Sequence, residues 1–200
     1  ELKQAVEEIK EKTGNKEGRY QVCDVTDAQQ IKRLVATAIA LNGRVDVLIN
    51  NAGGPPAGVF DDFSDEDWQR AFELNLLSFI RLISEVLPSM RESGAGRIVN
   101  VASSSVKESL DNLTLSNTFR AGIVGLSKNL SRELAKENIL INTVGPGRFS
   151  TERVKHLNEI LANKLGTTFE EVRKKSEKTI PIGRLGEPEE FAKVVVFLAS

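Results

Sequence analysis

The chain has 200 residues, 40% of them apolar, which is enough to bury one substantial hydrophobic core. Its formal net charge is -1 and its acidic and basic residues are interleaved, so neither a nucleic acid nor a membrane surface is expected as a partner. Cys23 is the only cysteine and His156 the only histidine, which argues against disulfides, metal sites and a serine-histidine-acid triad. We therefore expect a cytoplasmic protein without a metal.

Helical periodicity and short runs of β-branched residues alternate along the chain. Ser64 is the predicted N-cap of a long helix, and Pro188 lies in the first turn of the last one. The longest apolar run, residues 191–199, is far shorter than the ~20 residues that a membrane-spanning helix needs. In chain order the predicted elements are a helix at 1–13, a strand at 19–25, a helix at 27–43, a strand at 44–53, a helix at 64–90, a strand at 96–103, a helix at 115–136, a strand at 139–147, helical residues at 152–178 and a helix at 187–200.

Strands that alternate with helices, without hairpin turns between them, predict parallel β-α-β units. Their apolar runs are typical of strands that helices cover on both faces. We therefore predict an α/β fold with a doubly wound parallel sheet, a Rossmann-like three-layer α/β/α arrangement. No repeat, low-complexity segment or linker divides the sequence, so one domain is expected over residues 1–200.

Small or polar residues follow each of the four predicted strands. They are Asp24, then residues 50–53, then 103–105, then 145–147. The carboxyl ends of parallel strands meet at one edge of a sheet, where open α/β folds bind their ligands. Glycine, asparagine and serine also end strands simply as turn formers. Four such ends together favour a ligand site.

These residues belong to a longer ordered series of motifs. The series is CDVTD, VDVLINNAG, FELNLLS, SGAGRIVNVAS, GLSKNLSRELAKENILINTVGPGRFSTERV and IPIGRLGEPEEFAKVVVFLAS. In order and spacing it resembles the short-chain dehydrogenases/reductases, close to the 3-oxoacyl-carrier-protein reductase type, over essentially the whole chain. The resemblance implies an NAD- or NADP-dependent oxidoreductase acting on a small ketone or secondary alcohol.

The resemblance also implies roles for individual residues. Asp24 matches the acid that hydrogen-bonds the adenine amino group, and Val25 lies beside that ring. Asn75 matches the asparagine that holds a water in a proton relay, and Ser103 matches the serine that hydrogen-bonds the substrate carbonyl. The residues that shape the cofactor cleft would be Asn51, Ala52 and Gly53, and those that run along the nicotinamide would be Pro146, Gly147, Phe149 and Thr151.

Other implications concern the ends of the domain and its surroundings. The family's glycine-rich turn is expected before residue 1 and a further strand after residue 200, so the parent protein is expected to be longer. Residues 148–180 resemble a lid over the substrate, whose basic residues Arg148, Arg153, Arg173 and Lys174 would either recognise an acidic group or form a solvated surface. Homotetramers or homodimers are implied as well.

The sequence departs from the family at two positions. The family has a tyrosine thirteen residues after the serine and a lysine four residues later, where this chain has Ser116 and Arg120. An alkyl hydroxyl is a much weaker acid than a phenol, and a guanidinium does not readily release a proton. Three alternatives follow: an oxidoreductase with an atypical proton donor, a cofactor-binding relative that acts as a structural or regulatory subunit, or a different reaction on the same scaffold. Ser116 or Asn117 is also a candidate N-cap of its helix.

Overall fold

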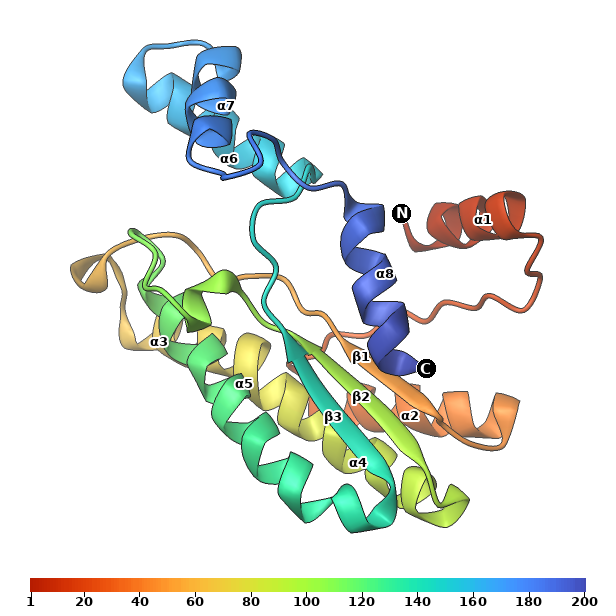
Figure 1. The fold of residues 1–200 in the computed structure, drawn as a ribbon. Helices are drawn as coiled ribbons and strands as arrows, with labels where there is room; N and C mark the ends of the chain where they lie inside the picture. The colour runs from red at the N-terminus through yellow and green to blue at the C-terminus, as the bar shows by residue number, and fades with distance from the viewer.

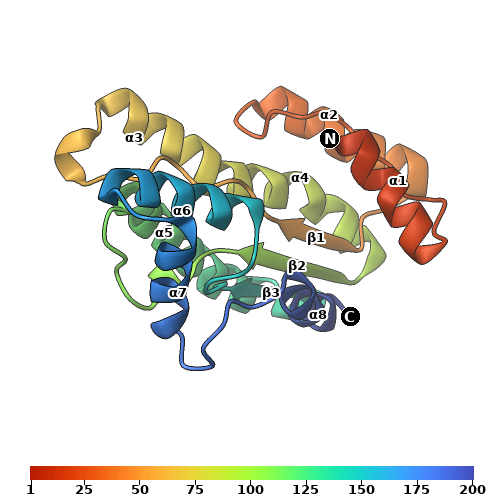
Figure 2. The same ribbon diagram turned by 90° about the horizontal axis from the view of Figure 1, so that it is seen from above.

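The computed structural model describes residues 1–200, except for the side chain of Arg153. Its centre is a three-stranded parallel sheet in the order β1 (Val47–Asn50), β2 (Gly96–Val101) and β3 (Ile139–Val144). Helices α2 (Ala28–Asn42), α4 (Ser78–Ser93) and α5 (Thr114–Glu133) lie on one face of the sheet, and α8 (Pro188–Ala199) covers the other (Figures 1 and 2). The predicted parallel α/β sheet with helices on both faces is confirmed.

Two hydrophobic cores result, because successive side chains of a strand point to opposite faces of a sheet. Ile98 of β2 packs in the core under α2, α4 and α5, which includes Val35 and Ile83. Its neighbour Val99 points the other way and packs with residues of α8 such as Val195. The central strand is buried on both faces, as its isoleucine and valine residues predict.

A chain of buried polar side chains crosses the sheet beneath its carboxyl edge. The amide of Asn50 donates to the Oδ1 of Asn100 at 2.8 Å, and the amide of Asn100 donates to the hydroxyl of Ser127 at 3.0 Å. Thr143 donates to the same hydroxyl at 2.7 Å. These bonds join all three strands to α5 just before the strands end, so they fix the relative positions of the loops that follow.

The prediction of a strand at 19–25 is wrong in this structure. Helix α1 (Leu2–Thr13) is followed by extended chain, in which Val22 is largely exposed, and by a turn at Val25 and Thr26. A strand needs a neighbouring strand to pair its backbone groups, and β1, β2 and β3 pair only with one another in the described chain. The Val- and Tyr-rich sequence is compatible with a strand, but nothing here pairs with it.

The predicted helix at 64–90 is a run of three helical segments. These are α3 (Asp65–Phe72), the π-helical turn η2 (Glu73–Leu77) and α4. Ser64 caps α3 as predicted, because its hydroxyl accepts from the backbone N–H of Asp67. A π-turn inside a long helix often marks a functional position, and this one contains Asn75.

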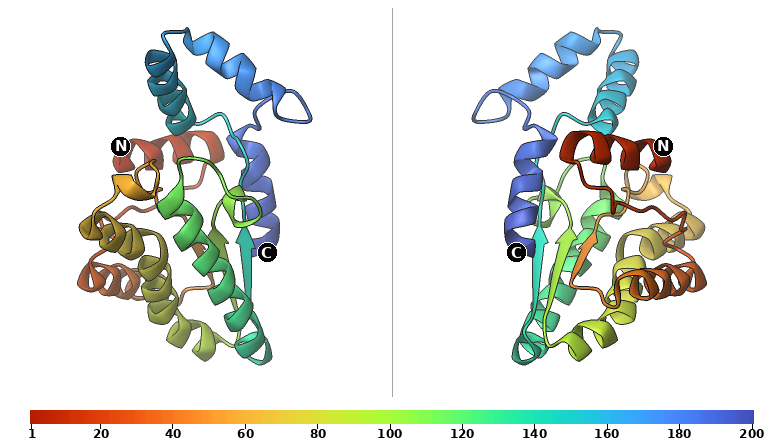
Figure 3. Two further views of the ribbon diagram at one scale, coloured as in Figure 1. Left: turned by 90° about the vertical axis from the view of Figure 1, so that its left-hand side faces the viewer. Right: turned by 90° about the vertical axis from the view of Figure 1, so that its right-hand side faces the viewer.

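Residues beyond β3 form a helical arm above the carboxyl edge of the sheet. It consists of α6 (Glu152–Leu165) and α7 (Phe169–Lys178), and Figures 1 and 3 show it projecting from the rest of the molecule. The two connecting segments that join the arm to the rest of the molecule pair with each other at one point. There the N–H of Ser150 donates to Gly186 O at 2.8 Å, and the N–H of Gly186 donates to Arg148 O at 3.0 Å. Within the described residues, no helix has both the length and the apolar content to cross a bilayer.

Candidate active site

A cavity of about 480 Å³ lies at the carboxyl edge of the sheet, beneath α6. Three of the four predicted strand ends contribute to it, together with α5 and the start of the arm. The predicted residues that line it are Asn51, Ala52, Gly53, Ser103, Ser116, Arg120, Pro146, Gly147, Phe149 and Thr151. Ten residues chosen from the sequence therefore surround one space.

Arg120 is the charged group of this cavity, and its side chain is only 7% exposed. Its Nη1 donates to two carbonyls at the end of β2, those of Val101 at 2.9 Å and Ala102 at 2.7 Å. Its Nη2 lies 3.4 Å from the carbonyl oxygen of Ala52, in the loop after β1. Backbone carbonyls thus hold the guanidinium, and the guanidinium in turn ties two strand ends to α5.

Ser116 lies one turn before Arg120, on the same face of α5, and is 7% exposed. The helix begins at Thr114 with Leu113 as its N-cap residue. The prediction that Ser116 or Asn117 caps the helix is therefore wrong, because both lie within the first turn. The Ser116 hydroxyl is left to face the cavity.

Ser103 stands at the end of β2, where its hydroxyl accepts from the backbone N–H of Ser105 at 3.1 Å. That bond orients the oxygen and leaves the hydroxyl proton for another acceptor. Tyr20, the single tyrosine of the chain, lies in the exposed segment before α2 and does not line the cavity. The only side-chain hydroxyls that line it are those of Ser103, Ser116 and Thr151 among the described residues.

Asn75 lies in the π-turn and is 1% exposed. Its amide donates to Ala71 O at 3.2 Å, while its Oδ1 is buried without a hydrogen-bond partner among the described residues. Asn75 does not line the cavity itself. A buried acceptor of this kind needs a donor from a bound molecule or water.

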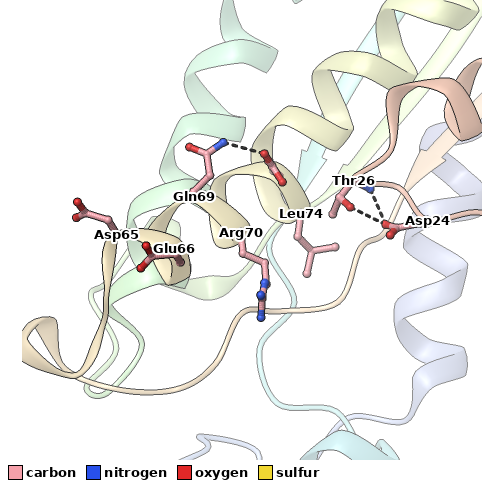
Figure 4. Close-up of a pocket in the computed structure, with 8 residues that line it drawn as sticks. Asp24, Thr26, Asp65, Glu66, Gln69, Arg70 and Leu74 are labelled. Carbon is pink, nitrogen blue, oxygen red and sulfur yellow. Dashed lines mark hydrogen bonds between the residues drawn. The ribbon is translucent and has the colours of Figure 1, made fainter.

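The structure does not bring Asp24 and Val25 into the same cavity. Asp24 borders a broad second hollow of about 700 Å³ with Thr26 and Arg70 (Figure 4). Val25 lines a third cavity instead. The N–H and hydroxyl of Thr26 both donate to the Asp24 carboxylate, at 2.9 and 2.8 Å. These bonds lower the pKa of Asp24 from its ordinary value, so it is an anion and an acceptor at neutral pH.

Away from the strand ends, sequence reasoning missed three apolar residues of the cavity wall: Leu113, Val154 and Leu157. Leu113 is held by a contact between two loops, in which the N–H of Gly58 donates to Asn112 O at 2.8 Å. A usable signal was present for each. Leu113 lies one helical turn before Ser116, and Val154 and Leu157 are three residues apart in the segment predicted as a lid.

Two of the four basic residues of the predicted recognition surface are engaged by side chains of α7. Arg148 donates to the hydroxyl of Ser176, and Arg173 pairs with Glu177 at 2.9 Å. The side chain of Arg153 lies outside the described residues. The described contacts of Arg148 and Arg173 fit a structural role better than capture of an acidic substrate.

Phe149 connects the cavity to the base of the arm. Its ring packs against Phe191 of α8 with centroids 5.2 Å apart, and it covers Gly186 so closely that a Cβ there would lie 2.6 Å from the ring. We expect Gly186→Ala to displace Phe149 and weaken ligand binding in the cavity several-fold, because its ring forms part of the wall.

The matched control is Gly125→Ala in α5, where an added Cβ meets nothing within 4 Å. Calorimetric titration with nicotinamide cofactors compares the two variants. Equal affinities in Gly186→Ala and Gly125→Ala would show that the Phe149 contact does not shape the site.

Comparisons with known proteins agree with this geometry. A family model described as enoyl-(acyl carrier protein) reductase matches residues 1–200. A 3-oxoacyl-(acyl-carrier-protein) reductase of Thermotoga maritima is 36% identical over 181 residues, which is 90% of this chain and 68% of the relative.

Solved structures agree as well. A crystal structure of an actinorhodin polyketide ketoreductase variant with NADPH has a TM-score of 0.93 and 34% identity, and the match covers 100% of this chain and 76% of the other. An NAD⁺-bound xylitol dehydrogenase has a TM-score of 0.89 and 28% identity, over 100% of this chain and 78% of the other. The family match, the relative and the shared fold together show that this chain belongs to the short-chain dehydrogenase/reductase family.

Proposed function

We propose that the protein is an NAD(P)-dependent oxidoreductase that transfers a hydride between nicotinamide and a ketone or secondary alcohol, with an atypical proton donor. The observation that carries this proposal is the cavity at the strand ends, which is lined by two glycine-containing segments, 51–54 and 146–151, and by the hydroxyls of Ser103 and Ser116. An open parallel sheet binds nucleotide cofactors at this edge. Proteins of the same fold have been solved with NADPH or NAD⁺ bound, which supports a nicotinamide cofactor for this chain.

The cavity has room for a flat ring against its backbone. A Cβ added at Gly53 or Gly147 would meet nothing within 4 Å, so both backbones present an open surface to the cavity. Gly145, by contrast, lies so close to the chain that follows β2 that a Cβ would be 2.8 Å from Ser103 O, and this contact brings the two strand ends together. The residues therefore fit the nicotinamide end of a dinucleotide, and Asp24 and Val25 are proposed to receive its adenine end.

When bound, the cofactor supplies or accepts the hydride. We assign Ser103 the hydrogen bond to the substrate oxygen, which gains negative charge as the ketone is reduced. Ser116 is the second hydroxyl that faces this oxygen, and the positive charge of Arg120 stabilises the same developing charge. Arg120 does not supply the proton, because a guanidinium does not release one near neutral pH.

The proton then comes from water or from a substrate group, relayed through a serine hydroxyl. Asn75 is assigned to hold one such water, since its buried Oδ1 needs a donor.

We further propose that residues 1–200 work as one domain, that 148–180 form its lid, and that the protein acts in the cytoplasm as a homotetramer or homodimer.

Ser116, which stands where the family has a tyrosine, favours a second candidate function. With no tyrosine at the cavity and Arg120 held by carbonyls, the chain has the features of a cofactor-binding relative that does not turn over, a structural or regulatory subunit. Binding would then persist without chemistry.

Turnover separates the two candidates. The full-length protein is incubated with NADPH or NADH and a broad panel of ketones, and with NADP⁺ or NAD⁺ and the matching alcohols. We expect a slow change of nicotinamide absorbance with at least one substrate. Cofactor binding without any such change would favour the non-catalytic relative.

A further inference from the structure

The cavity wall lacks a group that releases a proton near neutral pH. Its described lining contains no histidine, cysteine, tyrosine, lysine or acidic residue, and its side-chain hydroxyls belong to two serines and a threonine. Alkyl hydroxyls are far weaker acids than phenols, and a guanidinium does not lose its proton in proteins. A general acid is most effective when its pKa lies near the operating pH. The proton for a reduction in this cavity therefore comes from outside the protein.

One face of α5 presents an apolar, a hydroxyl and a cationic side chain in that order. Leu113 lies at the start of the helix, Ser116 follows three residues later and Arg120 four residues after that, and all three line the cavity. This spacing places them on one face, about 4.5 and 6 Å apart along the helix axis. A phenol has the matching order, because its apolar ring carries a hydroxyl that becomes an anion when it ionises.

The space beside Ser116 can accommodate a ring. Serine has a short side chain, so it fills little of the cavity between the longer side chains of Leu113 and Arg120. The whole cavity measures about 480 Å³, within the range of roughly 300 to 1,000 Å³ that is typical of ligand sites. An aromatic ring therefore fits there together with the nicotinamide end of a cofactor.

Arg120 brings a positive charge to this space. Its Nη1 donates to the carbonyl oxygens of Val101 and Ala102, which are neutral groups that fix the guanidinium at the cavity wall. No acidic residue lines the cavity in the described part of the chain. A cation within about 4 to 6 Å favours the ionised form of a weak acid. Arg120 therefore stabilises a phenolate beside Ser116, which makes a bound phenol a better proton donor than the same phenol in water.

We propose that the cavity binds a phenolic hydroxyl beside Ser116, between Leu113 and Arg120, and that this hydroxyl donates the proton to the substrate oxygen. The inference rests on the proposed function and names the chemical class of its proton donor. The carbonyl carbon accepts the hydride, the π electrons of the C=O bond move to oxygen, and the phenol O–H bond breaks as its proton passes to that oxygen. The products are a secondary alcohol and a phenolate, which recovers a proton from water. The hydroxyl belongs either to the substrate, as in an ortho-hydroxyaryl ketone, or to a separate small phenol.

Absorbance titration of 4-nitrophenol tests the site without cofactor or turnover. Its phenolate absorbs visible light and its neutral form does not, so a pH titration in excess protein gives the pKa of the bound phenol. We expect saturable binding and a pKa about one lower than in buffer, because Arg120 favours the phenolate. This shift corresponds to phenolate binding about tenfold tighter than neutral phenol. No saturable binding, or a bound pKa equal to or above the value in buffer, would overturn the inference.

Two variants and one analogue place the ring beside Ser116. Ser116→Phe fills the space with a ring of the protein, so affinity for 4-nitrophenol should fall about tenfold or more. The matched control is Gly125→Ala in the same helix, where an added Cβ meets nothing within 4 Å, and it should keep the wild-type affinity. Equal affinities in the two variants would contradict the proposal. Should Ser116→Phe not fold, 4-nitroanisole replaces it: this ring without a proton should compete about tenfold more weakly than 4-nitrophenolate for the wild-type protein, and equal competition would contradict the site.

Rates of ketone reduction identify the source of the hydroxyl. The protein is saturated with whichever of NADPH and NADH binds, and acetophenone is reduced with added phenol or with added anisole. A gain of about tenfold or more with phenol alone assigns the proton to a separate molecule. The same gain for 2′-hydroxyacetophenone over 2′-methoxyacetophenone, without a response to added phenol, assigns it to the substrate. No gain in either comparison would show that water is the donor and would overturn the inference.

The two kinds of measurement separate this inference from the proposed function. If no cofactor binds and no ketone is reduced, the proposed function fails and the donor role fails with it, whereas the 4-nitrophenol titration still decides whether the phenol site exists. If ketones are reduced but 4-nitrophenol does not bind, the proposed function stands and the inference is wrong.

Discussion

Replacing Ser116 with tyrosine is expected to raise the rate of ketone reduction by about two to four orders of magnitude, the usual contribution of a positioned general acid. A phenol with a pKa of ~10 is far more acidic than an alkyl hydroxyl, and a nearby cation lowers the phenol pKa further. Arg120 supplies that cation one helical turn away. Nicotinamide absorbance in single-turnover experiments measures the change.

Ser116→Phe is the matched control for the size of the ring. It fills the same space without an ionisable hydroxyl, so it should not accelerate reduction. An equal gain in Ser116→Phe would assign the effect to packing of the substrate. No gain in Ser116→Tyr, with cofactor still bound, would show that the missing proton donor is not what limits the reaction.

Replacing Arg120 with alanine is expected to destabilise the fold as well as the site. The change removes the guanidinium hydrogen bonds to Val101 O and Ala102 O, which are buried and come from a charged donor. Such bonds contribute about 1.5 to 3 kcal/mol each, so we expect loss of the two to lower the free energy of unfolding by about 3 to 6 kcal/mol. Urea denaturation measures it.

Cofactor affinity of the same variant tests whether Arg120 also takes the cofactor-binding role that the resemblance implies for this position. If Arg120 takes the place of the family's lysine and binds the nicotinamide ribose, affinity should fall together with stability. Arg120→Lys is the control, because it keeps the charge but loses the planar fork. Unchanged cofactor affinity in Arg120→Ala would exclude ribose binding and leave Arg120 as a residue that holds the strand ends.

Much of the fold could be predicted because the composition of the strands and the first residues of the helices indicate these elements locally. The central strand is rich in isoleucine and valine and is buried on both faces, and Ser64 and Pro188 start their helices where the sequence places them. Local composition was not sufficient to predict whether residues 19–25 form a strand. Its residues favour extended chain, but a strand also needs a neighbour, and no pattern within the segment reports one.

Some residues of the candidate site could be predicted from the sequence and others could not. Residues that end strands were found from the sequence because parallel topology places all strand ends at one edge. Leu113, Val154 and Leu157 were missed because their helical spacing indicates only a shared face, and the folded loops and arm are what bring that face to the cavity. The capping role suggested for Ser116 failed because the helix begins two residues earlier, at Thr114. The carbonyl contacts of Arg120 could not be read from spacing at all.

The central claim is that a nicotinamide cofactor binds in the cavity at the strand ends. Titration of NADPH and NADH, followed by nicotinamide fluorescence, tests it in the full-length protein and in Gly147→Leu. A side chain at Gly147 meets nothing within 4 Å at its Cβ and extends into the cavity, so folding should be unaffected. We predict saturable binding in the wild type and at least a tenfold loss of affinity in Gly147→Leu, with an unchanged melting temperature. Absence of binding in the wild type, or equal affinity in the two proteins, would contradict the claim.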